Sequence, residues 1–360
     1  MKQKYEFSVQ SHRFINSAGK ALMPLPARYA DLQLLEQAYE QMVLIRTFDQ
    51  KAIALQRTGK IGTYPSVLGH EAINIGAGLA LHQEDVFAPY YRDLGIQYLR
   101  GVSFVEQLMY WGGDERGSCY AKQPEDLPIC VPIATQFCHA AGVASAIKFR
   151  QQARAVLVSG GDGSTSKGDF LESLNLAGAW QLPLVFLVSN NQWAISTPRY
   201  LQCHAETLAQ KAIGAGIPGV QVDGNDFVAV HDTLTDALTR ARTGHGPTLV
   251  EAVTYRLGDH TTADDASRYR SQEDLKKAWE EEPIKRLRLY LSSQNAWDEK
   301  REQALLQRCK VTVEKAVADY AAIEPDVPTA MFDHLFATLP EDLHDQYEEL
   351  RRQTQEASHD

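Results

Sequence analysis

The chain has 360 residues, of which 44% are hydrophobic and 23% are charged, and its formal net charge is −10. These values are ordinary for a globular protein, and the length allows one large domain or two small ones. The negative charge argues against a nucleic-acid-binding protein, which would need a basic stripe.

The sequence indicates neither a membrane segment nor a disulfide framework. The longest apolar run, residues 182–188, is too short to cross a bilayer, and residues 1–10 lack the apolar core of a signal peptide. The five cysteines are odd in number and scattered, without a Cys-x-x-Cys pair, which argues against disulfides and against a zinc site. We therefore expect a cytoplasmic protein.

The N-terminal part of the chain predicts an extended segment followed by two helices. Residues 1–28 show no clear periodicity and end near two prolines, so we expect an arm. From residue 29 to about 57, apolar side chains recur at helical spacing, and Gly59 is expected to end that helix. A second helix is predicted over residues 70–81, where Glu71 suits the positive end of the helix dipole.

The middle of the chain alternates short apolar segments with helical ones. Strands are predicted over 154–159, 184–189, 219–223 and 248–254, and helices over 167–181, 205–214 and 226–242. Wholly apolar strands separated by helices predict an α/β fold, a doubly wound parallel sheet flanked by helices. Such sheets bind ligands at the carboxyl ends of their strands, so functional side chains are expected after residues 159, 189 and 254. The turn at residues 223–226 is interpreted as a helix N-cap.

The C-terminal part is charged and is predicted to be helical up to about residue 319. Residues 322–328 are interpreted as a linker, and residues 331–352 as one or two amphipathic helices. Their apolar anchors are Phe332, Leu335, Phe336, Leu339, Leu343 and Leu350. The expected organisation is an arm (1–28), a binding domain (29–321) and a linker with a helical tail (322–360) that packs on a partner subunit, with a plain solvated helix as the alternative.

The loop after the first of these strands, residues 160–169, has the sequence G-G-D-G-S-T-S-K-G-D and is a candidate anion site. Its glycines allow backbone N–H groups to approach a ligand, and the N-terminus of the following helix would favour a phosphate. A P-loop is excluded because Lys167 precedes a glycine, and a Rossmann fingerprint because no G-x-G-x-x-G opens the helix. A Mg²⁺–diphosphate site needs a second oxygen ligand from the next strand end, where Asn191 lies. Asp162 and Asn191 are therefore the predicted metal pair.

These two segments also carry a family resemblance. G-D-G-S-T-S-K-G-D-F at 161–170 and N-N-Q-W-A-I-S-T-P at 190–198 resemble the thiamine diphosphate motif. The sequences of these segments are similar to those of the alpha subunit of the decarboxylating first component of 2-oxo acid dehydrogenase complexes, the pyruvate and branched-chain type. Residues 89–93, 132–136 and 254–271 continue the resemblance, which covers about residues 30–340.

The resemblance implies that the chain has the thiamine diphosphate-binding fold and forms its diphosphate-binding domain. It also implies a role for individual residues. Asp162, Asn191 and the backbone carbonyl of Trp193 would ligate Mg²⁺. Arg92, Gly161, Gly163 and Ser164 would surround the diphosphate, Tyr91 and Ile133 would line the pocket for cofactor or substrate, and His260 would be the catalytic residue near the reactive end of the cofactor.

Some positions depart from the family pattern. Ser189 stands where some members carry an arginine that reaches the phosphate. Cys130 replaces a serine linked in some members to a monovalent cation, so that ion is in doubt. Thr261 stands where animal members have a phosphorylated serine, and we predict no regulation by a kinase. Arg116 lies where some members bring a pocket histidine, and its role, like that of Lys167, stays open.

Only one doubly wound sheet is visible, whereas thiamine enzymes need two domains around each cofactor. The resemblance therefore implies a beta subunit that carries the aminopyrimidine-binding domain, in an α₂β₂ assembly, and a lipoyl-bearing acyltransferase core. The expected activity is oxidative decarboxylation of a 2-oxo acid with reductive acylation of the lipoyl group. Pyruvate is the first choice of substrate, and branched-chain 2-oxo acids or acetoin are the alternatives.

Two other classes of protein compete with this interpretation. A catalytically silent assembly subunit would be expected to lose some of Asp162, Asn191, Arg92 and His260, and all four are present. A nicotinamide-dependent dehydrogenase is weakened by the missing glycine fingerprint.

Overall fold

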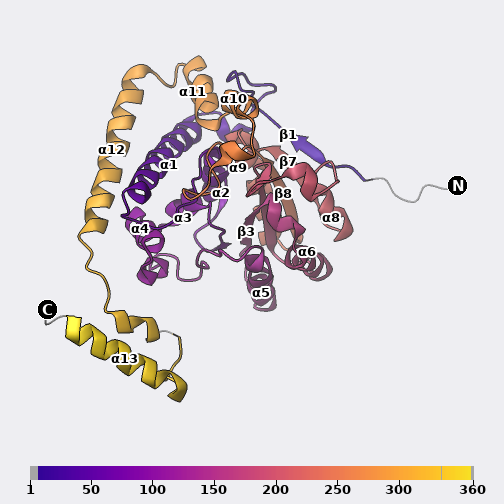
Figure 1. The fold of residues 1–360 in the computed structure, drawn as a ribbon. Coiled ribbons are helices and arrows are strands. Elements are labelled where there is room, and N and C mark those ends of the chain that lie inside the picture. Colours follow the sequence, from indigo (N-terminus) through magenta and orange to yellow (C-terminus); the bar gives the residue numbers. More distant parts are fainter. Residues whose placement is uncertain (1–6, 334, 358–360) are drawn as a thin grey trace. The chain divides into compact units, whose positions relative to one another are not determined.

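The computed structural model describes residues 7–333 and 335–357, and a six-stranded parallel sheet forms its centre (Figure 1). The strands lie in the order β1–β7–β8–β4–β3–β2. Their bounds are β1 Gln10–His12, β2 Val86–Ala88, β3 Val156–Gly161, β4 Leu184–Asn190, β7 Gly219–Asp223 and β8 Thr248–Val253. The predicted parallel α/β fold is confirmed. Residues 1–6 of the expected arm and 358–360 of the expected tail lie outside the described residues.

Helices cover both faces of this sheet. Those that pack directly on it are α2 Glu71–Ala80, α5 Thr135–Phe149, α6 Gly168–Trp180 and α9 Phe227–Arg242. On β3, Val156 and Val158 join one core with α5 and α6, whereas Leu157 joins the other core with α2 and α9. Since both faces of a strand are buried, its sequence is continuously apolar rather than alternating.

The N-terminal segment contributes an edge strand rather than a simple extended arm. β1 pairs in parallel with β7, with His12 opposite Val222. After β1, the backbone N–H groups of Phe14 and Ile15 donate to the carboxylate of Asp226 at 2.6 and 2.8 Å. The same carboxylate accepts from the backbone N–H of the second residue of α9 at 3.0 Å, which confirms the predicted N-cap.

The two predicted N-terminal helices are present with slightly shorter bounds. The first is α1 Gln33–Arg57, preceded by the 3-10 helix η1 Ala27–Tyr29. Gly59 has a φ of +71° just after α1, as a glycine that ends a helix does. In α2, Glu71 lies in the first turn, as expected, and also pairs with Arg46 at 2.8 Å.

Several elements between α2 and α9 differ from the sequence predictions. Those without a predicted counterpart are β2, α3 Leu94–Leu99, α4 Phe104–Gly112, η2 Glu115–Ser118, α5, the pair β5 Trp193–Ala194 and β6 Thr197–Pro198, and α7 Arg199–Gln202. The helix predicted over 205–214 is only partly correct, since it consists of η4 Leu208–Gln210 and α8 Lys211–Gly214.

The C-terminal part forms the expected charged helices. They are η5 Ala266–Arg268, α10 Gln272–Glu280, α11 Pro283–Ser293 and α12 Glu299–Ala321. Internal contacts divide the chain into two units, Met1–Val317 and Ala318–Asp360. No helix in the described residues is both long and apolar enough to cross a membrane.

The second unit contains η6 Pro328–Phe332 and α13 Glu341–Ala357. Phe332 packs edge-on against Tyr347, with ring centroids 5.7 Å apart. Of the one or two helices predicted over residues 331–352, the structure shows α13 and the end of η6, and the described residues between them are not helical. None of the described side chains of this unit is buried, so the unit has no core of its own.

Candidate active site

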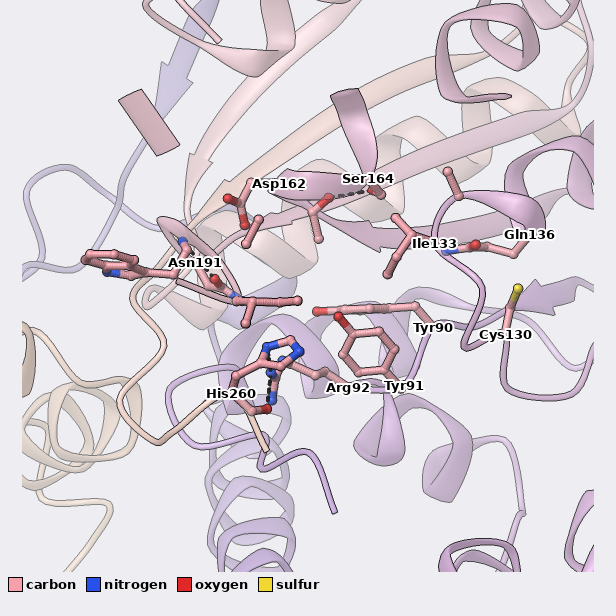
Figure 2. Close-up of a pocket in the computed structure, with 16 residues that line it drawn as sticks. Tyr90, Tyr91, Arg92, Cys130, Ile133, Gln136, Asp162, Ser164, Asn191 and His260 are labelled. Carbon is pink, nitrogen blue, oxygen red and sulfur yellow. Dashed lines mark hydrogen bonds between the residues drawn. The ribbon is translucent and has the colours of Figure 1, made fainter. Parts of the chain in front are cut away.

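A cavity of about 190 Å³ lies where the loops after β2, β3, β4 and β8 meet (Figure 2). The structure brings into its lining every residue that the sequence predicted for the site. These residues are Tyr91, Arg92, Ile133, Gly161, Asp162, Gly163, Ser164, Asn191, Trp193 and His260. The carboxyl ends of neighbouring parallel strands meet at one edge of a sheet, which explains why residues far apart in the sequence meet here.

The glycine-rich loop continues β3 as a 3-10 helix, η3 Asp162–Ser166. A Cβ atom on Gly163 would lie 2.6 Å from Cβ of Ala194, so a larger residue does not fit without a shift. Ser164 turns back and donates from Oγ to the carbonyl of Gly161 at 2.5 Å. Because η3 intervenes, the residues next to the cavity are those of η3, and not the first residues of α6 as the sequence suggested.

Asp162 places a buried carboxylate in the wall of the cavity. The residue is 1% exposed, and Nε2 of Gln202 donates to its Oδ2 at 2.8 Å. Burial raises the pKa of Asp162, while the hydrogen bond from Gln202 acts in the opposite direction. A bound cation would therefore stabilise the ionised form of this side chain.

Asn191 reaches the same cavity from the end of β4. Its Oδ1 accepts from the backbone N–H of Trp193 at 3.2 Å, and its Nδ2 lies 3.0 Å from Nε2 of His70. His70 is fully buried, and burial, followed by the charges of two nearby arginines, lowers its pKa to about 3. The ring is therefore neutral, and its Nε2 accepts the amide hydrogen of Asn191.

Two buried arginines lie next to one another here: Arg92 lines the cavity, and Arg256 contacts the lining residues His260 and Ile195. Arg92 is 1% exposed. It donates from Nη1 to the carbonyl of Ser66 at 2.5 Å and from Nη2 to the carbonyl of His260 at 2.5 Å. Arg256 is fully buried and donates to the carbonyl of Ile195 at 2.9 Å and to the hydroxyl of Tyr269 at 2.7 Å.

Neither guanidinium forms an ion pair with a carboxylate in the part of the chain that the structure describes. Burial, followed by the charge of Arg92, lowers the pKa of Arg256 to about 10. Buried charges are usually paired, so two unpaired guanidiniums favour a strongly anionic ligand. The sequence predicted Arg92 but assigned no role to Arg256. Its position two residues after the end of the predicted strand 248–254 is the signal that could have identified it.

His260 faces both arginines from the loop after β8. Its Nδ1 lies 3.0 Å from Nη2 of Arg92 and 3.4 Å from Nη1 of Arg256. Burial, followed by these two charges, lowers the pKa of His260 to about 4. The backbone N–H of His260 donates to Asp264 at 2.8 Å, which holds the loop. His260 is therefore a neutral imidazole, next to the ring of Tyr91.

The positions that the sequence left open are now located. The side chain of Lys167 is 53% exposed, pairs with Asp169 at 3.3 Å and does not line the cavity. Arg116 pairs with Asp114 and does not line the cavity. Cys130 lines the cavity, where its thiol donates to the carbonyl of Pro132 at 3.2 Å.

The residues present fit a diphosphate bound through a divalent cation. Within the described residues, no cluster of three or more His, Cys, Asp or Glu side chains could hold a metal alone. The cavity instead offers one carboxylate, one amide oxygen and the carbonyl of Trp193, with the guanidinium of Arg92 in its lining and that of Arg256 3.3 Å from the same carbonyl. Mg²⁺ in proteins is commonly held by one or two carboxylates together with phosphate oxygens, and this donor set suits that arrangement.

A cavity at the carboxyl edge of a parallel sheet is the place where α/β proteins of this architecture bind their ligands. The chain belongs to the dehydrogenase E1 component family, whose model matches residues 39–326. It is 41% identical over 320 residues to the 3-methyl-2-oxobutanoate dehydrogenase subunit alpha of Mycobacterium tuberculosis, covering 89% of this chain and 87% of that protein.

A second relative has a different substrate in its name. The chain is 38% identical over 319 residues to the pyruvate dehydrogenase E1 component subunit alpha of Staphylococcus aureus, covering 88% of this chain and 86% of that protein. The predicted family, the alpha subunits of 2-oxo acid dehydrogenases, is thereby confirmed, and with it the thiamine diphosphate-dependent class of enzyme. The nicotinamide-dependent alternative is wrong.

Proposed function

We propose that this chain binds Mg²⁺–thiamine diphosphate in the cavity and decarboxylates pyruvate for acyl transfer to the lipoyl group of a partner acyltransferase. The observation that carries the proposal is the buried guanidinium of Arg92 in the lining of the cavity, without a carboxylate partner among the described residues, beside Asp162 and Asn191. A second buried arginine without such a partner, Arg256, contacts the lining residues His260 and Ile195. Only a ligand with several negative charges would compensate both guanidiniums.

Each residue has a defined task in this proposal. Asp162, Asn191 and the carbonyl of Trp193 hold Mg²⁺, while Arg92 and the loop from Gly161 to Ser164 hold the diphosphate. When bound, thiamine diphosphate supplies the nucleophilic carbon and the electron sink that decarboxylation requires. The protein contributes position and charge.

His260 holds a proton at a defined atom. A guanidinium only donates hydrogen bonds, so Nδ1 of His260, which faces Arg92 and Arg256, is the acceptor. The hydrogen of the neutral ring therefore lies on Nε2, where it is available to an oxygen atom of a ligand in the cavity.

The substrate is a 2-oxo acid with a small apolar side chain. The cavity wall includes Tyr91, Ile133 and Ile195, which suit a methyl or an isopropyl group alike. Branched-chain 2-oxo acids are the second candidate, because the relative at 41% identity is named for 3-methyl-2-oxobutanoate. The ratio of kcat/KM for pyruvate to kcat/KM for 3-methyl-2-oxobutanoate decides between them.

A beta subunit completes the site in this proposal, in a cytoplasmic α₂β₂ complex. Apolar side chains on the loops around the cavity are exposed: Val131 by 51%, Ile133 by 44% and Ile195 by 57%. Exposed apolar groups around a cavity indicate a surface that another protein covers. In terms of domains, residues 1–28 are the N-terminal segment, which includes the edge strand β1, residues 29–321 bind the cofactor, and residues 322–360 pack on the partner.

The test compares the purified chain with the chain co-expressed with its beta subunit. We expect calorimetry to show tight binding of thiamine diphosphate with Mg²⁺ by the pair, and we expect only the pair to reduce an artificial electron acceptor with pyruvate. Turnover by the chain alone would contradict the two-chain site. A pair that binds no thiamine diphosphate would instead support a silent assembly subunit.

A further inference from the structure

Two polar side chains outside the predicted ligand set contact the predicted metal pair. Gln202, the last residue of α7, donates from Nε2 to Oδ2 of Asp162 at 2.8 Å. His70, the N-cap residue of α2, accepts at Nε2 from Nδ2 of Asn191 at 3.0 Å. Neither side chain lines the cavity, so each contacts its partner from outside it.

The carboxamide of Gln202 has a fixed orientation. Its Nε2 also donates to the carbonyl of Thr197 at 3.1 Å, and both of its partners are oxygen atoms that can only accept. Asp162 therefore receives a donor hydrogen bond from Gln202, and this bond restricts rotation of the carboxylate. The Oε1 atom of Gln202 is buried without a hydrogen-bond partner in the described residues, although its polar character calls for one.

The amide of Asn191 is also fixed. Its Oδ1 accepts from the backbone N–H of Trp193, so its Nδ2 must point toward His70. His70 has no exposed surface, which leaves its ring little freedom to move. The hydrogen bond with His70 thus directs the oxygen of Asn191 toward Trp193, whose carbonyl is the third predicted metal ligand.

We propose that Gln202 and His70 are positioning residues for the metal ion: Gln202 orients Asp162, and His70 orients Asn191. The inference rests on the proposed function, because it requires that Asp162 and Asn191 bind Mg²⁺. Residues that orient metal ligands commonly contribute about 10-fold to 100-fold to metal affinity. Loss of either side chain should therefore weaken metal binding, although the metal ligands themselves remain in the chain.

The test uses the complex of the chain with its beta subunit, with Mn²⁺ as a spectroscopic probe for Mg²⁺. Free Mn²⁺ is measured by electron paramagnetic resonance in the presence of thiamine diphosphate. We expect Gln202→Leu and His70→Leu each to weaken Mn²⁺ binding by about 10-fold to 100-fold. His70→Gln keeps a hydrogen-bond acceptor and should restore most of the affinity. The KM of the variants for Mg²⁺ should rise. Their kcat, measured at saturating Mg²⁺, should be affected less.

Matched controls separate positioning from general stability. His231→Leu removes a buried histidine that binds Tyr29, and Gln107→Leu removes a buried glutamine that binds the carbonyl of Leu94. Both controls should lower the melting temperature and leave Mn²⁺ affinity unchanged. If His70→Leu does not fold, His70→Ala, which also lacks an acceptor, replaces it, and Gln202→Leu remains the test for Asp162.

The outcomes are distinct. Unchanged Mn²⁺ affinity in Gln202→Leu and in the folded His70 variant without an acceptor, His70→Leu or His70→Ala, would overturn the inference while the proposed function stands. Equal weakening in the two control variants would also overturn it, because the effect would then reflect stability. Failure of the unaltered complex to bind Mn²⁺ with thiamine diphosphate would overturn the proposed function, and this inference with it.

Discussion

Arg92, Arg256 and His260 form a group whose charge is unusual for a protein interior. Two guanidiniums lie close to one imidazole, and burial together with these charges keeps the pKa of His260 at about 4. Desolvating an unpaired charge costs several kcal/mol, so this arrangement destabilises the empty chain. An anionic ligand would offset that cost by compensating both arginines. The group is therefore explained by ligand binding and not by the stability of the empty chain.

His231 offers a clean test of how buried histidines govern stability, because it is remote from the cavity. Burial, followed by the charge of Arg28, lowers its pKa to about 4, and its Nδ1 lies 2.8 Å from the hydroxyl of Tyr29. A histidine in the unfolded chain has a pKa near 6.5, so below that pH the unfolded chain binds the proton and the folded chain does not. The contribution to stability is therefore complete above pH 6.5 and is lost progressively as the pH falls toward 4.

We expect this loss to be absent from the variant His231→Gln. Between pH 7.5 and pH 5, the free energy of unfolding of the unaltered chain should fall by roughly 2 kcal/mol more than that of the variant. Urea denaturation at both pH values measures the difference. Parallel pH dependence in the two proteins would show that the folded-state pKa of His231 is not lowered.

At the scale of the element, the sequence predicted the strands that are buried on both faces, because their residues are almost all apolar. All seven residues of β4 are buried, and their apolar character identified the strand from the sequence. β1 and β2 have three residues each, and β1 is polar, so no periodicity could reveal them. The helix expected over 205–214 begins only at Leu208, after Thr207, whose extended backbone donates from its N–H to Oε1 of Gln210 at 3.2 Å.

Asp226 shows how one side chain at an element boundary can link two elements. It caps α9 at Val228, and it also accepts from the backbone N–H groups of Phe14 and Ile15 after β1. Asp226→Ala should therefore cost more than a lost cap, because two further N–H groups lose their acceptor. We expect the free energy of unfolding to fall by about 2 to 4 kcal/mol.

Ser103→Ala provides the comparison for Asp226→Ala. Ser103 belongs to a capping box with Glu106 at the start of α4 and makes only local hydrogen bonds, so its loss should cost about 0.5 to 2 kcal/mol. Chemical denaturation of both variants measures the two effects. Equal losses would contradict the role of Asp226 in holding the N-terminal segment.

At the scale of the whole molecule, the topology decides how much of the site the sequence can reveal. A parallel sheet places its strand ends at one edge, so Asp162 and Asn191 could be predicted to meet from their positions after β3 and β4. His70 and Gln202 could not be assigned roles in the same way. Each acts through a contact with a residue from another element, and only the three-dimensional arrangement brings these together.

The unit Ala318–Asp360 also has a predicted role at this scale. None of its described side chains is buried, and Met331, Leu335 and Phe336 are exposed by 59%, 66% and 52%. A segment with exposed apolar groups and no core is stabilised by packing on another surface, and we expect the beta subunit to supply that surface. Deleting residues 325–360 should therefore weaken the association of the two subunits.

We expect the deletion to raise the dissociation constant of the complex at least about tenfold, which corresponds to roughly 1.4 kcal/mol of lost contacts. The melting temperature of the isolated chain should change little, because the deleted segment contains no buried described side chain. Analytical ultracentrifugation measures the association, and calorimetry measures the melting temperature. The double substitution Leu335→Ser, Phe336→Ser keeps the length of the chain and should reproduce most of the weakening, whereas Glu348→Gln on α13 should not. If the truncated chain associates as tightly as the full chain, the tail is a solvated appendage, and the contacts between subunits must come from the surface around the cavity.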